Sequence, residues 1–276
     1  MAVFHADGLV IRSREYGESD RLLTLFTREY GKIQTVAKGV RKPKSRQRAG
    51  AQLFTYGDFL LHRGKTLHTV NQASPRESFP HLWNDFDKSM AAANMAELLD
   101  LATLENQPQQ ELFTLTFTGF FLLDAVEPLL LQAAYALRLM SILGYRPNLE
   151  ECAGCGETLK GERLFFNAQL GGLLCADCSK DAGGKFIRAG SIAFMRQLLS
   201  SDLTKLDRLR WNASMQEEVL ETVQGYCESK LERSLRCWRT GKQMQENVGR
   251  HLMNRKDGDS DERSGVERAG EVGCDP

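Results

Sequence analysis

The chain has 276 residues, of which 42% are hydrophobic and 26% charged, as in a globular protein with more than one domain. Its longest uncharged apolar stretch, Leu112 to Leu123, has 12 residues, and a bilayer span needs roughly 20. We therefore expect no membrane partner. No basic patch followed by an apolar run begins the chain, so we expect a cytoplasmic protein. Seven cysteines, four of them in two close pairs, favour metal ligation over disulfides in that compartment.

The charges are unevenly distributed, although the net charge is zero. Residues 1–80 hold 14 Lys and Arg against 7 Asp and Glu, and residues 81–150 hold 3 against 9. This difference indicates that the two segments have different tasks.

Residues 8–73 show a period-two pattern of apolar residues interrupted by turn residues. Five short strands within about 70 residues predict a small antiparallel barrel. We interpret residues 1–80 as an OB-fold nucleic-acid-binding domain, and an SH3-like barrel is the alternative.

Helical spacing of apolar residues begins after residue 82. It predicts helices over residues 84–105, 109–125, 128–145 and 190–201, and one long helix from Ala213 to about Val248. The fold class is therefore α+β and multidomain, with a helical domain formed by residues 81–150 and 184–250. Residues 254–276 are polar and almost free of large apolar side chains, so we expect a disordered tail.

The segment 151–183 contains two Cys-x-x-Cys pairs, formed by Cys152, Cys155, Cys175 and Cys178. Nineteen residues separate the pairs, which fits a zinc ribbon inserted in the helical domain. Four thiolates leave no open position for a catalytic water, so we predict one structural Zn²⁺. A thioredoxin-like redox site would instead be a single Cys-x-x-Cys pair at the start of a helix. The sequence does not show this arrangement, so we do not expect redox chemistry here.

The stretch AKGVRKPKSRQRAG, residues 37–50, is a candidate polyanion-binding loop. No acidic residue occurs between Gly31 and Gln52, and the loop carries Lys38, Arg41, Lys42, Lys44, Arg46 and Arg48. On an OB-type barrel such cations follow nucleic-acid phosphates. The alternative is a solvated loop without a ligand.

Further candidates lie on or beside the expected strands. The cations are Arg12, Arg14, Arg21 and Arg63, and the rings that could stack on bases are Tyr16, Tyr30, Phe54 and Tyr56. Aromatic residues in a barrel more often belong to the core.

The sequence contains no convincing catalytic motif. RGKT, residues 63–66, lacks the first glycine of a phosphate-binding loop, because that position is Phe59. The five histidines belong to no recognised nucleophile motif. We therefore expect no enzymatic activity.

Three motifs together resemble the bacterial RecO family of recombination mediators. They are E-x-D-x-L-L-x-x-F-T-x-x-x-G-K from Glu18, V-A-K-G-V-R from Val36, and L-G-Y-x-P-x-L-x-x-C from Leu143. The resemblance covers residues 1 to about 250.

The resemblance implies a protein that acts at the bacterial nucleoid and binds both single- and double-stranded DNA. It implies annealing of strands coated with single-strand-binding protein, docking of that protein's C-terminal tail, and cooperation with RecR in loading RecA. By the same resemblance, the loop cations contact DNA and the four cysteines hold zinc. A zinc-dependent enzyme, an interaction scaffold and an RNA-binding accessory factor are the alternatives.

Overall fold

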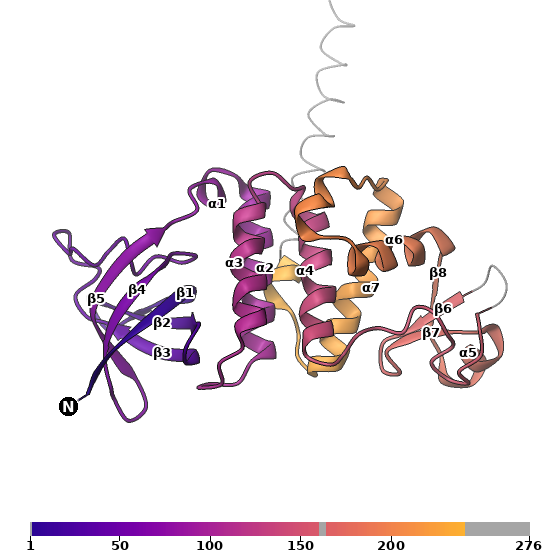
Figure 1. Cartoon of the computed structure of the whole chain (residues 1–276), viewed down its shortest axis with the longest axis horizontal. Helices are drawn as coiled ribbons and strands as arrows, with labels where there is room; N and C mark the ends of the chain where they lie inside the picture. The colour runs from indigo at the N-terminus through magenta and orange to yellow at the C-terminus, as the bar shows by residue number, and fades with distance from the viewer. Residues whose placement is uncertain (1, 160–163, 241–276) are drawn as a thin grey trace, which may run out of the picture. The chain divides into compact units, whose positions relative to one another are not determined.

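The computed structural model describes residues 2–159 and 164–240. A five-stranded barrel precedes the helices (Figure 1). Its strands are β1 (Val3–Tyr16), β2 (Asp20–Thr27), β3 (Gly31–Ala37), β4 (Tyr56–His62) and β5 (His68–Glu77). The helices are α1 (His81–Asn84), α2 (Phe86–Ala102), α3 (Gln110–Leu122), α4 (Pro128–Ile142), α6 (Ala189–Ser200), the 3-10 helix η1 (Leu203–Arg208) and α7 (Ala213–Leu231). Between α4 and α6 lie β6 (Leu164–Asn167), β7 (Gly172–Leu174), α5 (Ala176–Ala182) and β8 (Lys185–Ile187).

The barrel is closed, with the strand order β1-β2-β3-β5-β4. β4 pairs with β1 in antiparallel fashion, whereas β3 pairs with β5 in parallel. Alternate side chains fill the interior, as the fully buried Phe59 and Leu61 of β4 illustrate. The order is that of a five-stranded Greek-key barrel, so the expected OB-like fold is confirmed.

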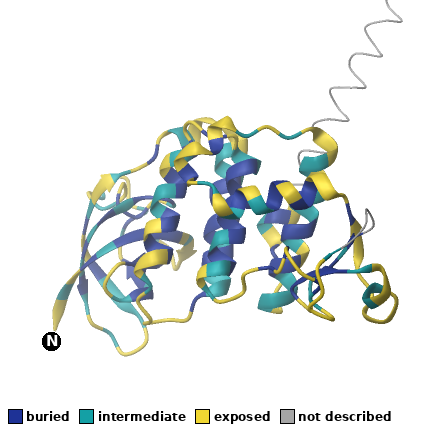
Figure 2. Ribbon diagram, turned by 45° about the vertical axis from the view of Figure 1, so that its right-hand side comes forward, coloured by how far each residue is buried: buried dark blue, intermediate teal, exposed yellow. Residues whose placement is uncertain are grey.

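The helical part is built around α4, most of whose residues are buried (Figure 2). Pro128 occupies its first turn, and the Glu127 carboxylate accepts hydrogen bonds from the N–H groups of Leu129 and Leu130. Two buried polar pairs join α4 to its neighbours. The Asn94 amide of α2 donates to Gln132 at 2.7 Å, and the hydroxyls of Thr116 and Tyr135 lie 2.9 Å apart.

A cluster of aromatic side chains, here called the aromatic seam, joins the barrel to α3. Its α3 members are Phe113, Phe117 and Phe120, whose spacing places them on one side of the helix. The closest ring pairs are Tyr56–Phe117 at 4.9 Å and Phe54–Phe120 at 5.3 Å between centroids. The seam consists of Phe26, Phe54, Tyr56, Phe79, Phe113, Phe117 and Phe120.

A buried ion pair reinforces this contact. Lys32 of β3 is 8% exposed, and its Nζ donates to the backbone oxygen of Asp100 at 2.5 Å and to its carboxylate at 3.0 Å. The N–H of Asn106 donates to the Lys32 carbonyl at 2.9 Å. The segment after α2 therefore runs directly against β3.

The expected single helix from Ala213 to about Val248 was wrong because the helix is interrupted, and helical residues begin again at Arg236. α7 ends at Leu231, because Glu232 adopts a left-handed conformation with φ 52° and ψ 34°. The short α1, α5, η1 and β8 were not predicted from the sequence. Residues 241–250 and the expected disordered tail, residues 254–276, lie outside the described part of the chain.

None of the described helices combines the length and the apolar character that are needed to cross a bilayer.

We predict that Gly31→Ala lowers the free energy of unfolding by at least ~3 kcal/mol, measured by urea denaturation followed by circular dichroism. Gly31 has φ +67°, and an added Cβ would lie 2.0 Å from the Gln107 carbonyl oxygen. Gly17→Ala is the matched control, because Gly17 has φ +60° but open space around it. Its expected cost is only ~1–2 kcal/mol. Equal costs would contradict the close approach of residue 107 to β3.

Candidate nucleic-acid interface and metal centre

The basic loop between β3 and β4 is a compact series of turns. The N–H of Lys42 donates to the Gly39 carbonyl at 3.2 Å, and that of Ser45 donates to the Lys42 carbonyl at 3.0 Å. Val40 and Ala51 belong to the barrel core and are 2% and 1% exposed. Because both ends of the loop are anchored in the core, the backbone that carries the charged side chains is held against the barrel.

The turn between β1 and β2 holds the start of the loop. The N–H of Gly39 donates to the Asp20 carboxylate at 2.7 Å, and the N–H of Arg41 donates to the Ser19 carbonyl at 2.9 Å. The Arg41 guanidinium also pairs with the Glu15 carboxylate at 3.0 Å. Arg41 is thus partly neutralised.

The other loop cations point away from the core. They form no ion pair with any residue that the structure describes, so their charge is uncompensated. These exposed residues are Lys38, Lys42, Lys44, Arg46 and Arg48. A surface of this kind attracts polyanions.

Arg12 and Arg14 lie on β1 and outside the loop. Arg12 pairs with Asp100 of α2 at 3.5 Å, although its side chain remains 61% exposed. Arg14 is exposed and forms no ion pair with the described residues. Arg63, in the β4–β5 connection, lies over the Phe4 ring at 5.2 Å. Arg12 and Arg63 therefore make contacts within the protein, whereas Arg14 does not pair with a described carboxylate.

The four aromatic candidates differ in access. Phe54 is 1% exposed and belongs to the aromatic seam, so it cannot stack on a base. The Tyr56 hydroxyl donates to the Asp7 carboxylate at 2.9 Å, and its ring also belongs to the seam. Tyr30 is half-buried, and Tyr16 is 48% exposed. Only Tyr16 of these four keeps a largely open ring.

Trp83 of α1 is an aromatic residue at this surface that the sequence did not single out. It is 51% exposed, and its ring centroid lies 5.8 Å from that of Phe54. It lines the same cavity as Arg41 and Arg48. No local pattern in the sequence indicates this position, because the contact joins residues far apart along the chain.

The four cysteines form one cluster. Each offers a sulfur, and these atoms all lie within 4.8 Å of one another. Tetrahedral four-sulfur coordination at about 2.3 Å places sulfurs roughly 3.8 Å apart, so the donor set fits a metal ion after small adjustments. The cluster could therefore hold a metal ion.

Backbone N–H groups surround the cysteine sulfurs. The N–H of Cys175 points to the Cys152 sulfur at 3.4 Å. Burial acts to raise the pKa of Cys152, but hydrogen bonds from backbone N–H groups, including those of Cys175 and Cys155, outweigh it and lower that pKa to about 6. Side-chain hydrogen bonds with the other three thiols raise the pKa of Cys178 to about 12. The site thus stabilises the negative form of one sulfur, Cys152, and metal binding would release the protons of the others.

A side chain at position 154 would crowd the turn that carries the first cysteine pair. A Cβ on Gly154 would lie 3.1 Å from the sulfur of Cys178. The intervening segment forms the expected hairpin, in which Phe165 of β6 pairs with Leu174 of β7. The third strand, β8, pairs with the other edge of β6.

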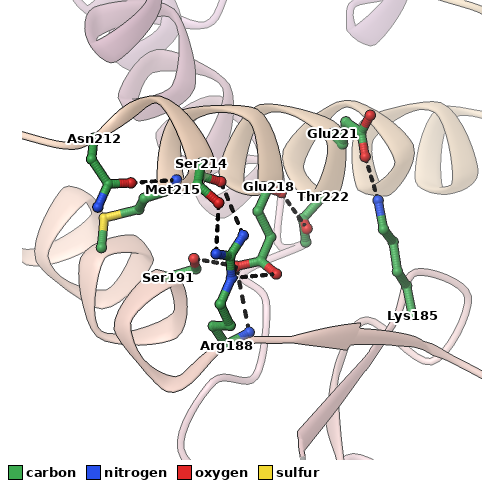
Figure 3. Close-up of polar contacts among 9 residues, drawn as sticks. All are labelled: Lys185, Arg188, Ser191, Asn212, Ser214, Met215, Glu218, Glu221 and Thr222. Carbon is green, nitrogen blue, oxygen red and sulfur yellow. Dashed lines mark hydrogen bonds and ion pairs between the residues drawn. The ribbon is translucent and has the colours of Figure 1, made fainter.

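A polar network connects β8 and the start of α6 to α7 (Figure 3). The Arg188 Nε lies 3.3 and 3.2 Å from the two carboxylate oxygens of Glu218, and its Nη1 donates to the Ser214 hydroxyl at 2.6 Å. The Ser191 hydroxyl donates to the same carboxylate, and Lys185 pairs with Glu221. The carboxylate of Glu218 is 11% exposed, so these donors compensate a largely desolvated charge.

Together, an OB-like barrel with an exposed cationic loop and a helical part with a cysteine cluster are features typical of nucleic-acid-binding proteins. Comparison with known families supports this class. Residues 1–79 match the family "Recombination protein O N terminal", and residues 84–239 match "Recombination protein O C terminal".

Full-length relatives carry the same family name. The chain is 60% identical over 275 residues to "DNA repair protein RecO" of Desulfitobacterium hafniense DCB-2, covering 98% of this chain and 100% of the relative. The protein of the same name from Heliobacterium modesticaldum is 39% identical over 258 residues, with coverage of 91% and 92%. The chain belongs to the RecO family of DNA repair and recombination proteins.

We predict that Glu218→Gln lowers the free energy of unfolding by about 1–3 kcal/mol, because it leaves Arg188 without a carboxylate partner. Urea denaturation measures the change. The control is Glu217→Gln at the neighbouring exposed position, for which we expect a change within ~0.5 kcal/mol. If the two variants were equally stable, the network in Figure 3 would not stabilise the packing of α6 on α7.

Proposed function

We propose that this protein is a non-enzymatic recombination mediator that acts on DNA in the cytoplasm, at the bacterial nucleoid. It binds single- and double-stranded DNA and anneals complementary strands coated with single-strand-binding protein. With RecR it promotes RecA loading, and it docks the C-terminal tail of single-strand-binding protein. Membership of the RecO family supports these roles.

The observation that carries the proposal is the loop at residues 37–50. Five of its cations are exposed and lack carboxylate partners among the described residues, and the loop is tied to the barrel by Val40, Ala51 and Asp20. Rigid, unpaired cations bind a phosphate backbone without reading bases. In this proposal residues 1–80 bind DNA, with Lys38, Arg41, Lys42, Lys44, Arg46 and Arg48 as the main contacts and Arg12 and Arg14 as secondary ones.

Annealing follows from charge neutralisation. Two complementary strands repel each other through their phosphates, and a cationic surface reduces this repulsion. Contacts to the backbone leave most base edges free to pair. The protein itself therefore needs no nucleotide hydrolysis.

We also propose that the four cysteines hold one Zn²⁺ with a structural role. The all-sulfur donor set and the backbone N–H groups around it favour zinc over harder cations. The ion would supply binding free energy that folds a module too small to be stable alone. In this proposal residues 151–183 are an insert in a helical domain formed by residues 81–150 and 184–250.

We predict that the variant K42E/K44E/R46E anneals complementary oligonucleotides coated with single-strand-binding protein at least about tenfold more slowly than wild type. The slope of log K against log salt on single strands should fall by about 2, since each phosphate contact contributes roughly 0.7. A quenched-fluorophore assay without ATP measures the annealing rate, and fluorescence anisotropy measures the salt slope.

The control variant K205E/R208E/R233E makes the same change in net charge at exposed positions of the helical part. It should anneal and bind as wild type does. If wild type binds DNA but does not anneal it, the mediator function is wrong and a scaffold function takes its place. Preferential binding of RNA in competition would support the RNA-binding alternative.

We predict one zinc per chain by elemental analysis, with four sulfurs at about 2.3 Å by X-ray absorption. Removing the metal with a chelator should lower Tm and expose the cysteine module to proteolysis, because the metal contributes to folding. Cys155→Ser should show the same changes without chelator. An oxygen or nitrogen ligand in the absorption spectrum would contradict a closed structural site.

A further inference from the structure

A cavity of about 560 Å³ opens beside the basic loop, at the junction of the barrel with α1. Its size lies within the range of roughly 300–1,000 Å³ that is typical of small-molecule sites. The lining residues are Ser13, Arg21, Val40, Arg41, Arg48, Ala51, Gln52, Leu53 and Trp83. The loop that carries the exposed cations thus also forms one wall of this open cavity.

Three guanidinium groups give this cavity a positive character. Arg41 pairs with Glu15, but Arg21 and Arg48 have no carboxylate partner among the described residues. Arg21 donates to the Ser13 hydroxyl at 3.0 Å, and Arg48 donates to the Arg41 carbonyl at 3.4 Å. These contacts orient Arg21 and Arg48 but do not neutralise them, because both acceptors are uncharged. The two guanidinium groups can therefore form charge-assisted hydrogen bonds with an anion in the cavity.

The cavity also has an aromatic and apolar side. Trp83 is supported by the buried ring of Phe54, yet it remains 51% exposed. Leu53 is half-buried beside it, and Val40 and Ala51 are buried in the barrel core. A large exposed indole held next to unpaired arginines is the combination that binds a planar base together with its phosphate.

We propose that this cavity takes one unpaired nucleotide of single-stranded DNA, whose base stacks on Trp83 while Arg21 and Arg48 hold the adjoining phosphate. The proposal rests on the DNA-binding function proposed above and assigns a specific site to it. A base in a duplex is stacked on its neighbours and cannot enter without being flipped out, which costs a few kcal/mol. The cavity therefore distinguishes single strands from duplexes, whereas the exposed loop cations do not.

The test is the affinity of full-length Trp83→Leu for a labelled oligo(dT) and for a duplex of equal length, measured by anisotropy at one salt concentration. Single-strand affinity should fall by about 5- to 100-fold, which corresponds to the loss of one stacked base. Duplex affinity and the salt slope should change less than about twofold, because no cation is removed. Trp83→Phe should restore most of the single-strand affinity.

Phe86→Leu is the matched control, because Phe86 is a similarly exposed aromatic residue, at 53%, that does not line the cavity. It should leave both affinities unchanged. Oligo(dT) should quench the tryptophan emission of wild type, and Trp83→Phe should lose this quenching while it still binds. Retained quenching in Trp83→Phe would place the stacked base at another tryptophan and overturn the proposal.

Two results separate this inference from the proposed function. If wild type binds neither DNA, the proposed function fails. If K42E/K44E/R46E loses affinity but Trp83→Leu binds single strands as wild type does, DNA binding stands and the nucleotide site is wrong. Equal losses on single strands and duplexes in Trp83→Leu would also overturn the site.

Discussion

The packing of Phe54 is the interaction on which both the barrel junction and the candidate DNA surface depend. Its backbone has φ +64°, which is unfavourable for a residue with a side chain, and the ring is 1% exposed. Contacts with Phe120 of α3 and Trp83 of α1 offset that cost. The end of the basic loop is therefore held between the barrel and the helices, and Phe54 also packs against Trp83, which lines the cavity.

The excess positive charge of the N-terminal segment has two different uses. Lys32 and Arg12 both contact Asp100, so part of the basic charge of the barrel and part of the acidic charge of the helices neutralise each other within the fold. Of the loop cations only Arg41 has a carboxylate partner among the described residues, Glu15. The charge available to a ligand is thus concentrated on one ordered loop, which a count of charges along the sequence could not show.

Much of the architecture follows from local patterns. Alternation of apolar residues predicts the barrel strands, Pro128 predicts the start of α4, and the spacing of Cys152, Cys155, Cys175 and Cys178 predicts their cluster. What the sequence misses depends on contacts between distant segments. The residue that ends α7 in a left-handed conformation is Glu232, and not the glycine that would have indicated a helix end in the sequence. Trp83 and Arg48 line the same cavity only in the folded chain. Periodicity reports which face of an element is buried, but it does not report which elements meet.

Annealing requires a surface that binds separate strands but releases the duplex, and in our proposal the loop cations and the cavity beside Trp83 meet these two requirements separately. Binding through phosphates alone is tight at low salt but does not distinguish single strands from duplexes, so it would retain the product as firmly as the substrate. A cavity that accepts one unpaired base adds affinity only for the substrate. If the proposed nucleotide site is right, pairing of that base removes the stacking contact with Trp83 and leaves the duplex held by the loop cations alone. Under this arrangement pairing itself weakens the grip on the product, and no nucleotide hydrolysis is needed for release.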